Sequence, residues 1–253
     1  MINGRRFLIC FLILIFVINV FIFADTDNQA RKIVKKIDEL YRSKTSYAKI
    51  EMTIETPHWK RTLQMVVWTE GMKKTFIRIL SPKKDKNTAT LKIGNQMWNY
   101  LPKVNKIIKI PPSMMMSSWM GSDFTNDDLV KEYTFLDDYD FKIVDNKGEK
   151  DKIFVLCIPK KGVAIVWSKI MLAVDKKSYI PIWEKYYDDR GDVVREMSFS
   201  DVKRIGSRVV PMTMVMIPLK KKGHKTIIRY LELKYDIKLN NSIFSIRNLR
   251  NIR

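Results

Sequence analysis

The sequence predicts a mainly β protein, in which one meandering antiparallel sheet curls around an apolar concave surface with a movable cover. From Ser46 onward, apolar and polar residues alternate with a period of two along successive short segments. Turn signals of hairpin length, such as Gly94-Asn95, separate these segments. Several segments are apolar on both faces, and a sheet of this many strands must curl. We therefore expect an open, curved sheet rather than a flat one.

Length and composition favour one globular domain. The chain has 253 residues, of which 46% are hydrophobic and 29% are charged, and these values are ordinary for a folded protein. No internal repeat or low-complexity linker divides it. We expect residues 25–253 to form a single domain.

The charge is strongly positive, at +20, and the lysines are spread along the whole chain. Such a spread favours attraction to an anionic membrane surface. Nucleic acid is the competing interpretation, but the sequence contains no recognisable nucleic-acid-binding motif. We therefore expect no nucleic-acid partner.

The first 24 residues have the features of a secretory signal peptide. Two arginines precede an apolar run from Phe7 to Phe23, which ends in Ala24-Asp25. The run is long for a signal and slightly short for a membrane-spanning helix, so an uncleaved anchor is the alternative. In both cases we expect the two arginines to stay on the cytoplasmic side of the membrane and the rest of the protein to be exported.

A helix is predicted to begin at Thr26 or Asp27, either of which can cap it, and to extend to about Arg42. Its apolar residues recur at helical spacing, and they are Ala30, Ile33, Val34, Ile37 and Tyr41. An isolated helix of this length is marginally stable. We therefore expect it to pack into or across the sheet.

Twelve strands are predicted from the two-residue period. The first six are Tyr47–Glu55, Arg61–Glu70, Lys74–Leu80, Thr88–Ile93, Met97–Leu101 and Val104–Ile110. The other six are Lys152–Ile158, Ile165–Val174, Ile180–Asp188, Val193–Val202, Arg208–Ile217 and Lys225–Asp236. Regular short strands joined by tight turns favour a single antiparallel meander.

The segment between the two groups of strands is predicted to be a lid, with a short helix near residues 113–132. The sixth strand ends against Pro111-Pro112, which cannot donate ladder hydrogen bonds. A run rich in Met and Trp follows, and then a turn at Gly121-Ser122 and a helix start at Thr125. Such an apolar surface is costly to leave in water unless something covers it or binds to it.

Eleven apolar residues are the candidate ligand-binding residues of the lid and cavity. They are Met114, Met115, Met116, Trp119, Met120, Phe124, Trp98, Met65, Met212, Met214 and Met216. Methionine tolerates ligands of varied shape, which suits binding of acyl chains of different length. The alternative is that these residues simply fill the core, as apolar residues usually do.

Three sequence motifs resemble outer-membrane lipoprotein-sorting proteins, which are relatives of the periplasmic lipoprotein carrier. The motifs are GNQMWNYLP at residues 94–102, WMGSDFTNDDL at residues 119–129 and FSIRNLRNIR at residues 244–253. The resemblance covers Asp25 to Arg253. It implies a half-barrel, that is, an incomplete β-barrel of antiparallel strands with a helical lid over an apolar cavity. It also implies a periplasmic protein that handles lipoprotein acyl chains or lipids without catalysis.

Catalytic and metal chemistry are poorly supported. The two histidines, His58 and His224, lie far apart beside turn signals, and no hydrolase, P-loop or metal-binding motif is present. The acidic group between Asp123 and Asp140 is the alternative catalytic or cation site, but structural roles explain it better. Thr125 and Asp128 have capping-box spacing, and Asp127 and Asp128 suit a helix start. Asp137, Asp138 and Asp140 are interpreted as water-exposed edge residues. Cys157, in an apolar strand, is interpreted as a small buried hydrophobe. We expect no enzyme activity, no metal and no cofactor.

Two other roles remain open. A protein with this half-barrel could act as a lipoprotein-sensing regulatory module, in which ligand binding alters a protein contact. It could also be an accessory lipid-binding subunit of an envelope transporter, with an inner-membrane transporter as partner. The sequence does not separate these roles from delivery of cargo toward the outer membrane.

Overall fold

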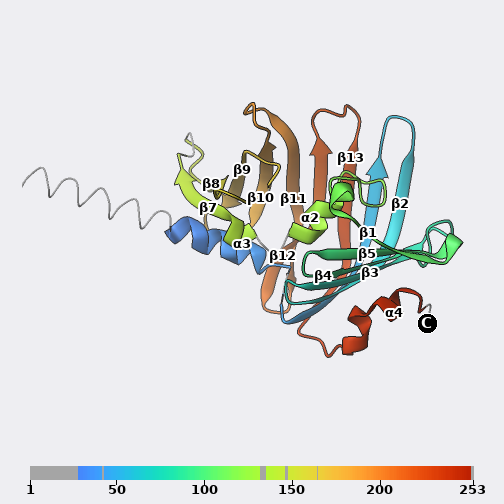
Figure 1. The fold of residues 1–253 in the computed structure, drawn as a ribbon. Helices are drawn as coiled ribbons and strands as arrows, with labels where there is room; N and C mark the ends of the chain where they lie inside the picture. Colours follow the sequence, from blue (N-terminus) through green and yellow to red (C-terminus); the bar gives the residue numbers. More distant parts are fainter. Residues whose placement is uncertain (1–27, 42, 132–134, 146–147, 164, 252–253) are drawn as a thin grey trace, which may run out of the picture.

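The computed structural model describes residues 28–41, 43–131, 135–145, 148–163 and 165–251 (Figure 1). The segment expected to be a signal peptide, residues 1–24, lies outside the described residues. Among those that are described, no helix is long and apolar enough to cross a membrane.

Strands dominate the fold. Their bounds are β1 Thr45–Glu55, β2 Lys60–Glu70, β3 Lys74–Ser81, β4 Ala89–Ile93, β5 Gln96–Leu101, β6 Lys106–Lys109, β7 Tyr139–Val144, β8 Lys152–Pro159, β9 Lys169–Asp175, β10 Pro181–Tyr187, β11 Val193–Ile205, β12 Arg208–Pro218 and β13 Lys225–Tyr235. The helical elements are an amino-terminal helix over residues 28–38, α2 Asn126–Lys131, α3 Phe135–Asp138, α4 Ile246–Leu249 and the 3₁₀ turns η1 Pro102–Val104, η2 Pro112–Met114 and η3 Asn241–Phe244.

The thirteen strands of the described residues form one antiparallel sheet that does not close. Their order is β6-β5-β4-β3-β2-β1-β13-β12-β11-β10-β9-β8-β7, so the two halves of the chain join where β1 pairs with β13. The predicted mainly β class and open sheet are therefore confirmed. Strands β6 and β7 form the two free edges, although they are consecutive in the chain. The segment between them thus has to run from one edge of the sheet to the other.

Each of the twelve predicted strands corresponds to one in the structure, with ends that differ by a few residues. Strand β7 was not predicted. Its alternation is nevertheless clear, because Tyr139 and Phe141 are buried while Asp140 and Lys142 are exposed. The strand is hard to recognise in the sequence because Asp137, Asp138 and Asp140 around its start indicate water-exposed edge residues.

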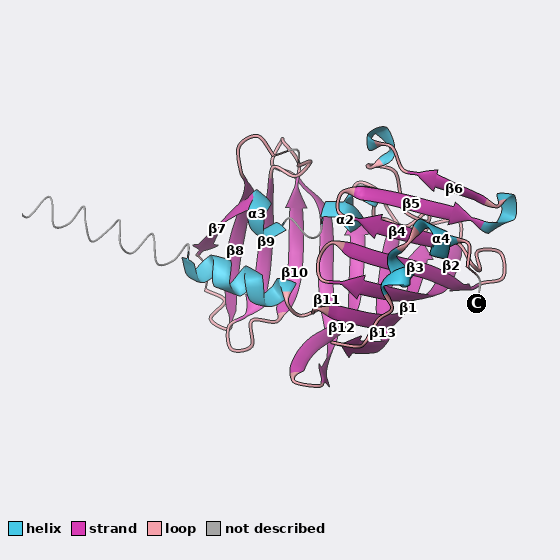
Figure 2. Cartoon of the chain, turned by 60° about the horizontal axis from the view of Figure 1, so that its bottom comes forward, coloured by secondary structure: helices cyan, strands magenta, loops and turns pink. Residues whose placement is uncertain are grey.

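One face of the sheet is covered by the amino-terminal helix and by the lid segment (Figures 1 and 2). The helix buries Ala30, Ile33 and Val34 in a cluster with residues of the β7–β10 half, including Cys157, which is fully buried. The lid packs against the β1–β3 half, where Trp119 and Val130 join the core around Met52 and Leu63 in a second cluster. These two clusters place the apolar interior on the concave side.

The opposite face of β3–β5 is covered by the carboxyl-terminal segment, which contains η3 and α4. Phe244 and Leu249 are buried there against Phe76, Leu91 and Tyr100. The guanidinium of Arg78 donates to the carbonyl of Asn248 at 2.7 Å and so fixes the end of the chain. Both faces of these strands are therefore buried, which explains why both are apolar.

Candidate functional site

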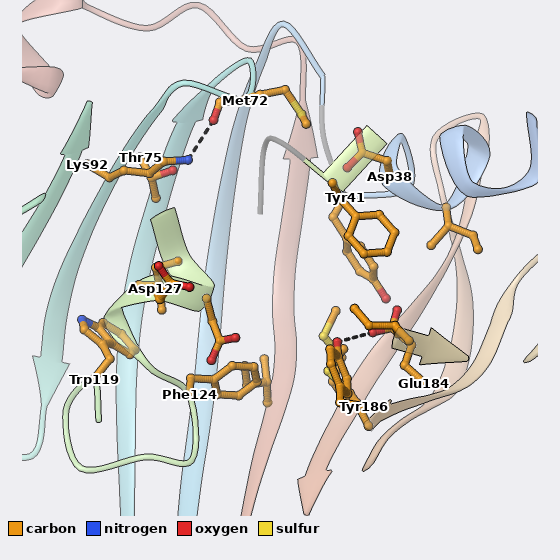
Figure 3. Close-up of a pocket in the computed structure, with 18 of the residues that line it drawn as sticks. Asp38, Tyr41, Met72, Thr75, Lys92, Trp119, Phe124, Asp127, Glu184 and Tyr186 are labelled. Atoms are coloured by element: carbon orange, nitrogen blue, oxygen red, sulfur yellow. Dashed lines mark hydrogen bonds between the residues drawn. The ribbon is translucent and has the colours of Figure 1, made fainter. Parts of the chain in front are cut away.

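A cavity of about 410 Å³ lies between the concave face, the amino-terminal helix and the lid (Figure 3). Its lining comes from both halves of the sheet, because β1–β4 contribute on one side and β9–β13 on the other. It also includes helix residues such as Val34 and Ile37, Tyr41 just after the helix, and lid residues such as Trp119 and Phe124. The cavity is therefore formed by tertiary packing of the whole sheet, and no single motif contains it.

Most of the wall is apolar, and the strand period determines which residues reach it. On β1 the alternate residues Ile50 and Met52 line the cavity, and on β2 Met65 and Val67 do so. Ile228 of β13 comes from the strand that pairs with β1. Side chains of adjacent antiparallel strands stand side by side on one face, so these residues form a continuous apolar surface.

The lid is held in place mainly through side chains. The indole nitrogen of Trp119 donates to the hydroxyl of Thr90 on β4 at 3.1 Å, and the Trp119 side chain is 5% exposed. The guanidinium of Arg61 on β2 donates to the carbonyl of Met120. Asp123 accepts a hydrogen bond at 2.7 Å from the hydroxyl of Thr226 on β13. The lid is thus fixed to three different strands.

The helix of the lid begins with the predicted capping box, in which an aspartate replaces the usual glutamate. The hydroxyl of Thr125 accepts from the amide of Asp128 at 3.1 Å, and Oδ2 of Asp128 accepts from the amide of Thr125 at 2.8 Å. This pair satisfies two amide groups that would otherwise lack a partner at the helix start.

Asp128 also pairs with Arg195 of β11, and this pair links the lid to the β7–β13 half of the sheet. Nη1 of Arg195 lies 2.9 Å from each carboxylate oxygen, and its side chain is only 8% exposed. Burial is the largest single influence on the pKa of Arg195 and lowers it, but the charge and hydrogen bonds of Asp128, together with Tyr186 and Glu184, outweigh burial, so the pKa is raised. The guanidinium therefore stays charged inside the protein.

Aromatic rings surround the buried guanidinium of Arg195. Its central carbon lies 4.5 Å from the ring centre of Tyr186, 5.3 Å from that of Trp167 and 5.8 Å from that of Phe124. Such contacts stabilise a cation that has lost its water. The Nε atom of Arg195 is buried and has no hydrogen-bond partner. This N–H donor lies in a side chain that lines the cavity.

The remaining charged groups of the lining are mostly acidic, although the chain as a whole is strongly basic. They include Asp38, Asp127, Asp138 and Glu184, together with the cation Lys92. The ammonium of Lys92 donates to the carbonyl of Met72 at 2.9 Å, and the hydroxyl of Tyr186 donates to Glu184 (Figure 3). Burial is the main reason that the pKa of Tyr186 is raised well above its ordinary value. The described residues contain no cluster of His, Cys, Asp and Glu that could hold a metal ion.

The structure brings four of the eleven candidate residues to the cavity wall: Met65, Trp119, Phe124 and Met214. Met115 and Met120 of the lid are partly buried against the core below it, and Met212 is a member of that core. Met216 is fully buried.

Three candidates lie away from the cavity. Met114 and Met116 are on the outer side of the lid, with exposures of 45% and 50%. Trp98 packs against the carboxyl-terminal segment on the other face of the sheet, while its neighbour Met97 points into the core. Trp98 is partly buried on this face because the carboxyl-terminal segment covers this part of the convex side of the sheet.

Sequence reasoning missed the polar residues of the cavity, above all Arg195, Lys92 and Glu184. Each occupies an alternate position of a strand whose polar residues would ordinarily face water. A charged residue such as Lys92 between Leu91 and Ile93 gives no local sign that its face is the inner one.

The fold is similar to that of three solved structures. A putative outer membrane lipoprotein-sorting protein domain from Vibrio parahaemolyticus has 20% identity and a TM-score of 0.75, with 88% of this chain and 99% of that chain covered. A LolA superfamily protein from Nitrosomonas europaea has 18% identity and a TM-score of 0.72, with coverage of 87% and 98%. A DUF1329 family protein from Desulfovibrio piger has 22% identity and a TM-score of 0.79, with coverage of 89% and 99%.

The family itself is identified by sequence. A family model described as "Uncharacterized protein" matches residues 71–251, and the chain belongs to this family. No curated protein sequence matches the chain. The resemblance predicted from the three sequence motifs is thus confirmed at the level of the fold.

Proposed function

We propose that this protein is a periplasmic carrier that holds lipoprotein acyl chains or lipids in its cavity and sorts them toward the outer membrane. The observation that supports this most directly is the apolar cavity between the curved sheet and a lid attached by side chains. The likeness to lipoprotein-sorting domains supports the same role. Export by residues 1–24, contact with an inner-membrane transporter and contact with anionic membranes are parts of this proposal.

The size of the cavity suits one acyl chain. An engineered apolar cavity of about 150 Å³ in another protein binds benzene, which has six carbons. On that scale the volume of about 410 Å³ accommodates roughly sixteen carbons. A lipid with several chains would need the lid to move outward, so lid opening belongs to the proposed cycle of loading and release.

The energetics allow reversible binding. Burial of about 0.8 kcal/mol per methylene gives on the order of 12 kcal/mol for such a chain, as an upper bound. Lost translational and rotational freedom costs several kcal/mol or more. The difference corresponds to binding that is useful but not irreversible, as a carrier requires.

The test replaces one cavity residue and its immediate neighbour on the same strand. Met214 lines the cavity, while Val215 belongs to the alternate face of β12. Met214→Asp places an unpaired charge against the acyl chain and should abolish lipid retention, whereas Val215→Asp should leave retention unchanged. Lipid extraction and native mass spectrometry of protein purified without detergent measure the bound lipid, and thermal melts report the fold.

Absence of lipid from the wild-type protein would contradict the proposal, as would equal retention by the two folded variants. Loss of lipid from both variants with equally lowered melting temperatures would show that packing, and not a site, was disturbed. The two variants can be compared directly because both introduce an aspartate, at positions one residue apart.

A further inference from the structure

We propose that residues 101–116, hereafter the edge wing, form a surface that docks on an anionic lipid bilayer. The edge wing comprises the end of β5, η1, the edge strand β6, the two prolines that follow, and η2 with the two residues after it. Figure 2 shows β6 at the margin of the sheet, with a short helical turn at each end. This inference rests on the part of the proposed function that concerns anionic membranes and assigns a surface to that contact; the surface lies away from the cavity and requires nothing in it.

The edge wing concentrates exposed apolar side chains. Five of the thirteen exposed large hydrophobic residues in the described part of the chain fall within its sixteen positions, and they are Leu101, Val104, Ile108, Met114 and Met116. Val104, next to the tip of the β5–β6 hairpin, is 58% exposed and is the most exposed of the thirteen. Scattered single apolar residues are normal on a protein surface, but a local concentration of this kind indicates a contact surface.

The same segment is basic throughout. Lys103, Lys106 and Lys109 are all exposed, and the chain contains no Asp or Glu from residue 101 to residue 118. Apolar side chains interspersed with lysines are the combination that enters the interface of an anionic membrane. A second copy of this chain fits the surface poorly, because a symmetric contact would bring two triply charged patches together.

The edge wing is also protected against adding a strand from another protein. Strand β6 is four residues long and has a lysine at each end. Pro102 precedes it, and Pro111-Pro112 follow shortly after it. Short edges with lysine and proline discourage edge-to-edge pairing. A partner that makes no backbone hydrogen bonds, such as a bilayer, remains compatible with this surface.

The hairpin is held firmly enough to present these side chains. Asn105 adopts a left-handed conformation at the tip, with φ of 49°, and its amide donates to the carbonyl of Pro102 at 3.2 Å. The hydroxyl of Tyr100 donates to the Asn105 side chain at 3.3 Å. The ammonium of Lys109 lies 5.6 Å from the ring centre of Trp98. The tip is thus part of the folded sheet and not a loose loop.

A depth measurement tests the proposal on the full chain, whether or not the amino-terminal segment is itself in the membrane. Val104→Cys is labelled with an environment-sensitive dye in a Cys10→Ser background, and Leu231→Cys serves as the control label. Leu231, on β13, is 50% exposed and lies outside the edge wing; Cys157 is fully buried. In vesicles that contain phosphatidylglycerol, brominated lipids should quench the dye at position 104 and leave the dye at position 231 bright.

Charge is tested with two matched triple variants. The first variant changes Lys103, Lys106 and Lys109 to Gln. Its partition coefficient into the vesicles, measured by quenching at position 104, should fall by roughly a hundredfold, since each lysine near an anionic surface contributes substantially to binding. The same change at Lys150, Lys176 and Lys177, which are exposed near the opposite edge of the sheet, should leave quenching intact.

Equal quenching at positions 104 and 231, or equal effects of the two triple variants, would overturn the proposal in favour of general adsorption. Quenching that is equally strong in purely zwitterionic vesicles would overturn the role of the lysines. Absence of quenching at position 104 would refute docking itself. The Met214→Asp variant should dock normally, so failure of docking and failure of lipid carriage are distinguishable.

Discussion

The ion pair between Arg195 and Asp128 makes a quantitative prediction about the lid. At 2.9 Å and an effective dielectric constant of 20, the gross attraction between the charges is about 6 kcal/mol. The side chains are 8% and 19% exposed, so solvent screens the pair only weakly. Removing one partner of a buried pair costs about 3–5 kcal/mol, because the other charge is left without compensation.

We expect Asp128→Asn to lower the free energy of unfolding by about 3 kcal/mol or to open the lid so that water reaches Arg195. Urea denaturation measures the first outcome. Hydrogen exchange of lid peptides, residues 111–131, measures the second. Either outcome follows from the same cause, which is that a buried guanidinium has lost its partner.

Part of the effect of Asp128→Asn comes from helix capping, and a control isolates that part. Thr125→Ala removes the cap hydroxyl and leaves the ion pair in place, so it should cost about 1 kcal/mol. The double variant Arg195→Met with Asp128→Leu replaces both charges with apolar side chains and should recover most of the stability. The reasoning is refuted if Asp128→Asn costs no more than Thr125→Ala with an equally protected lid, or if the double variant is as unstable as the single one.

Three further predictions concern buried groups. Burial raises the pKa of Tyr186 above its ordinary value of 10.0, so the unfolded chain ionises first and stability should fall as pH rises above about 10; urea midpoints measured across that range should depend less on pH in Tyr186→Phe. Burial also raises the pKa of the Cys157 thiol well above 9.0, so in a Cys10→Ser background a maleimide should react at pH 8 only at the rate of unfolding, and fast labelling of the folded protein would contradict this. Trp119→Phe removes the hydrogen bond to Thr90 and should cost about 1 kcal/mol in the free energy of unfolding; an unchanged value would show that this bond does not fix the lid.

The strands could be predicted from the sequence because their alternation is local. In Arg208–Pro218, for example, every second residue from Val210 to Met216 lies on one face, and the pattern is visible without knowledge of the partners. The lid was predicted for a related reason, since prolines end β6 and a capping box begins α2. The cost of exposing the apolar residues between them could also be estimated from the sequence.

The polar part of the cavity could not be predicted because it depends on contacts between distant residues. Arg195 and Asp128 are 67 residues apart, and their pairing results from the path of the lid between the two sheet edges. Lys92 faces the cavity because Leu91 is buried on the other face, beneath the carboxyl-terminal segment. The alternation shows which residues share a face. It does not show which face is covered by a segment more than a hundred residues away.

The topology explains how such a cavity can open without loss of the sheet. The lid joins β6 to β7, the two edges of the sheet. Bonds between two backbone groups form within the lid, for example from the amide of Trp119 to the carbonyl of Phe124 at 2.8 Å and from the amide of Asp127 to the carbonyl of Met115 at 2.8 Å. Its polar contacts with the sheet run through side chains such as Arg61, Thr90 and Arg195. Side-chain contacts can be exchanged for water one at a time, whereas a β-ladder resists opening because its bonds are cooperative. An outward movement of the lid therefore requires no change in strand pairing, and in the proposed function the curved sheet remains as a fixed wall during loading and release of the ligand.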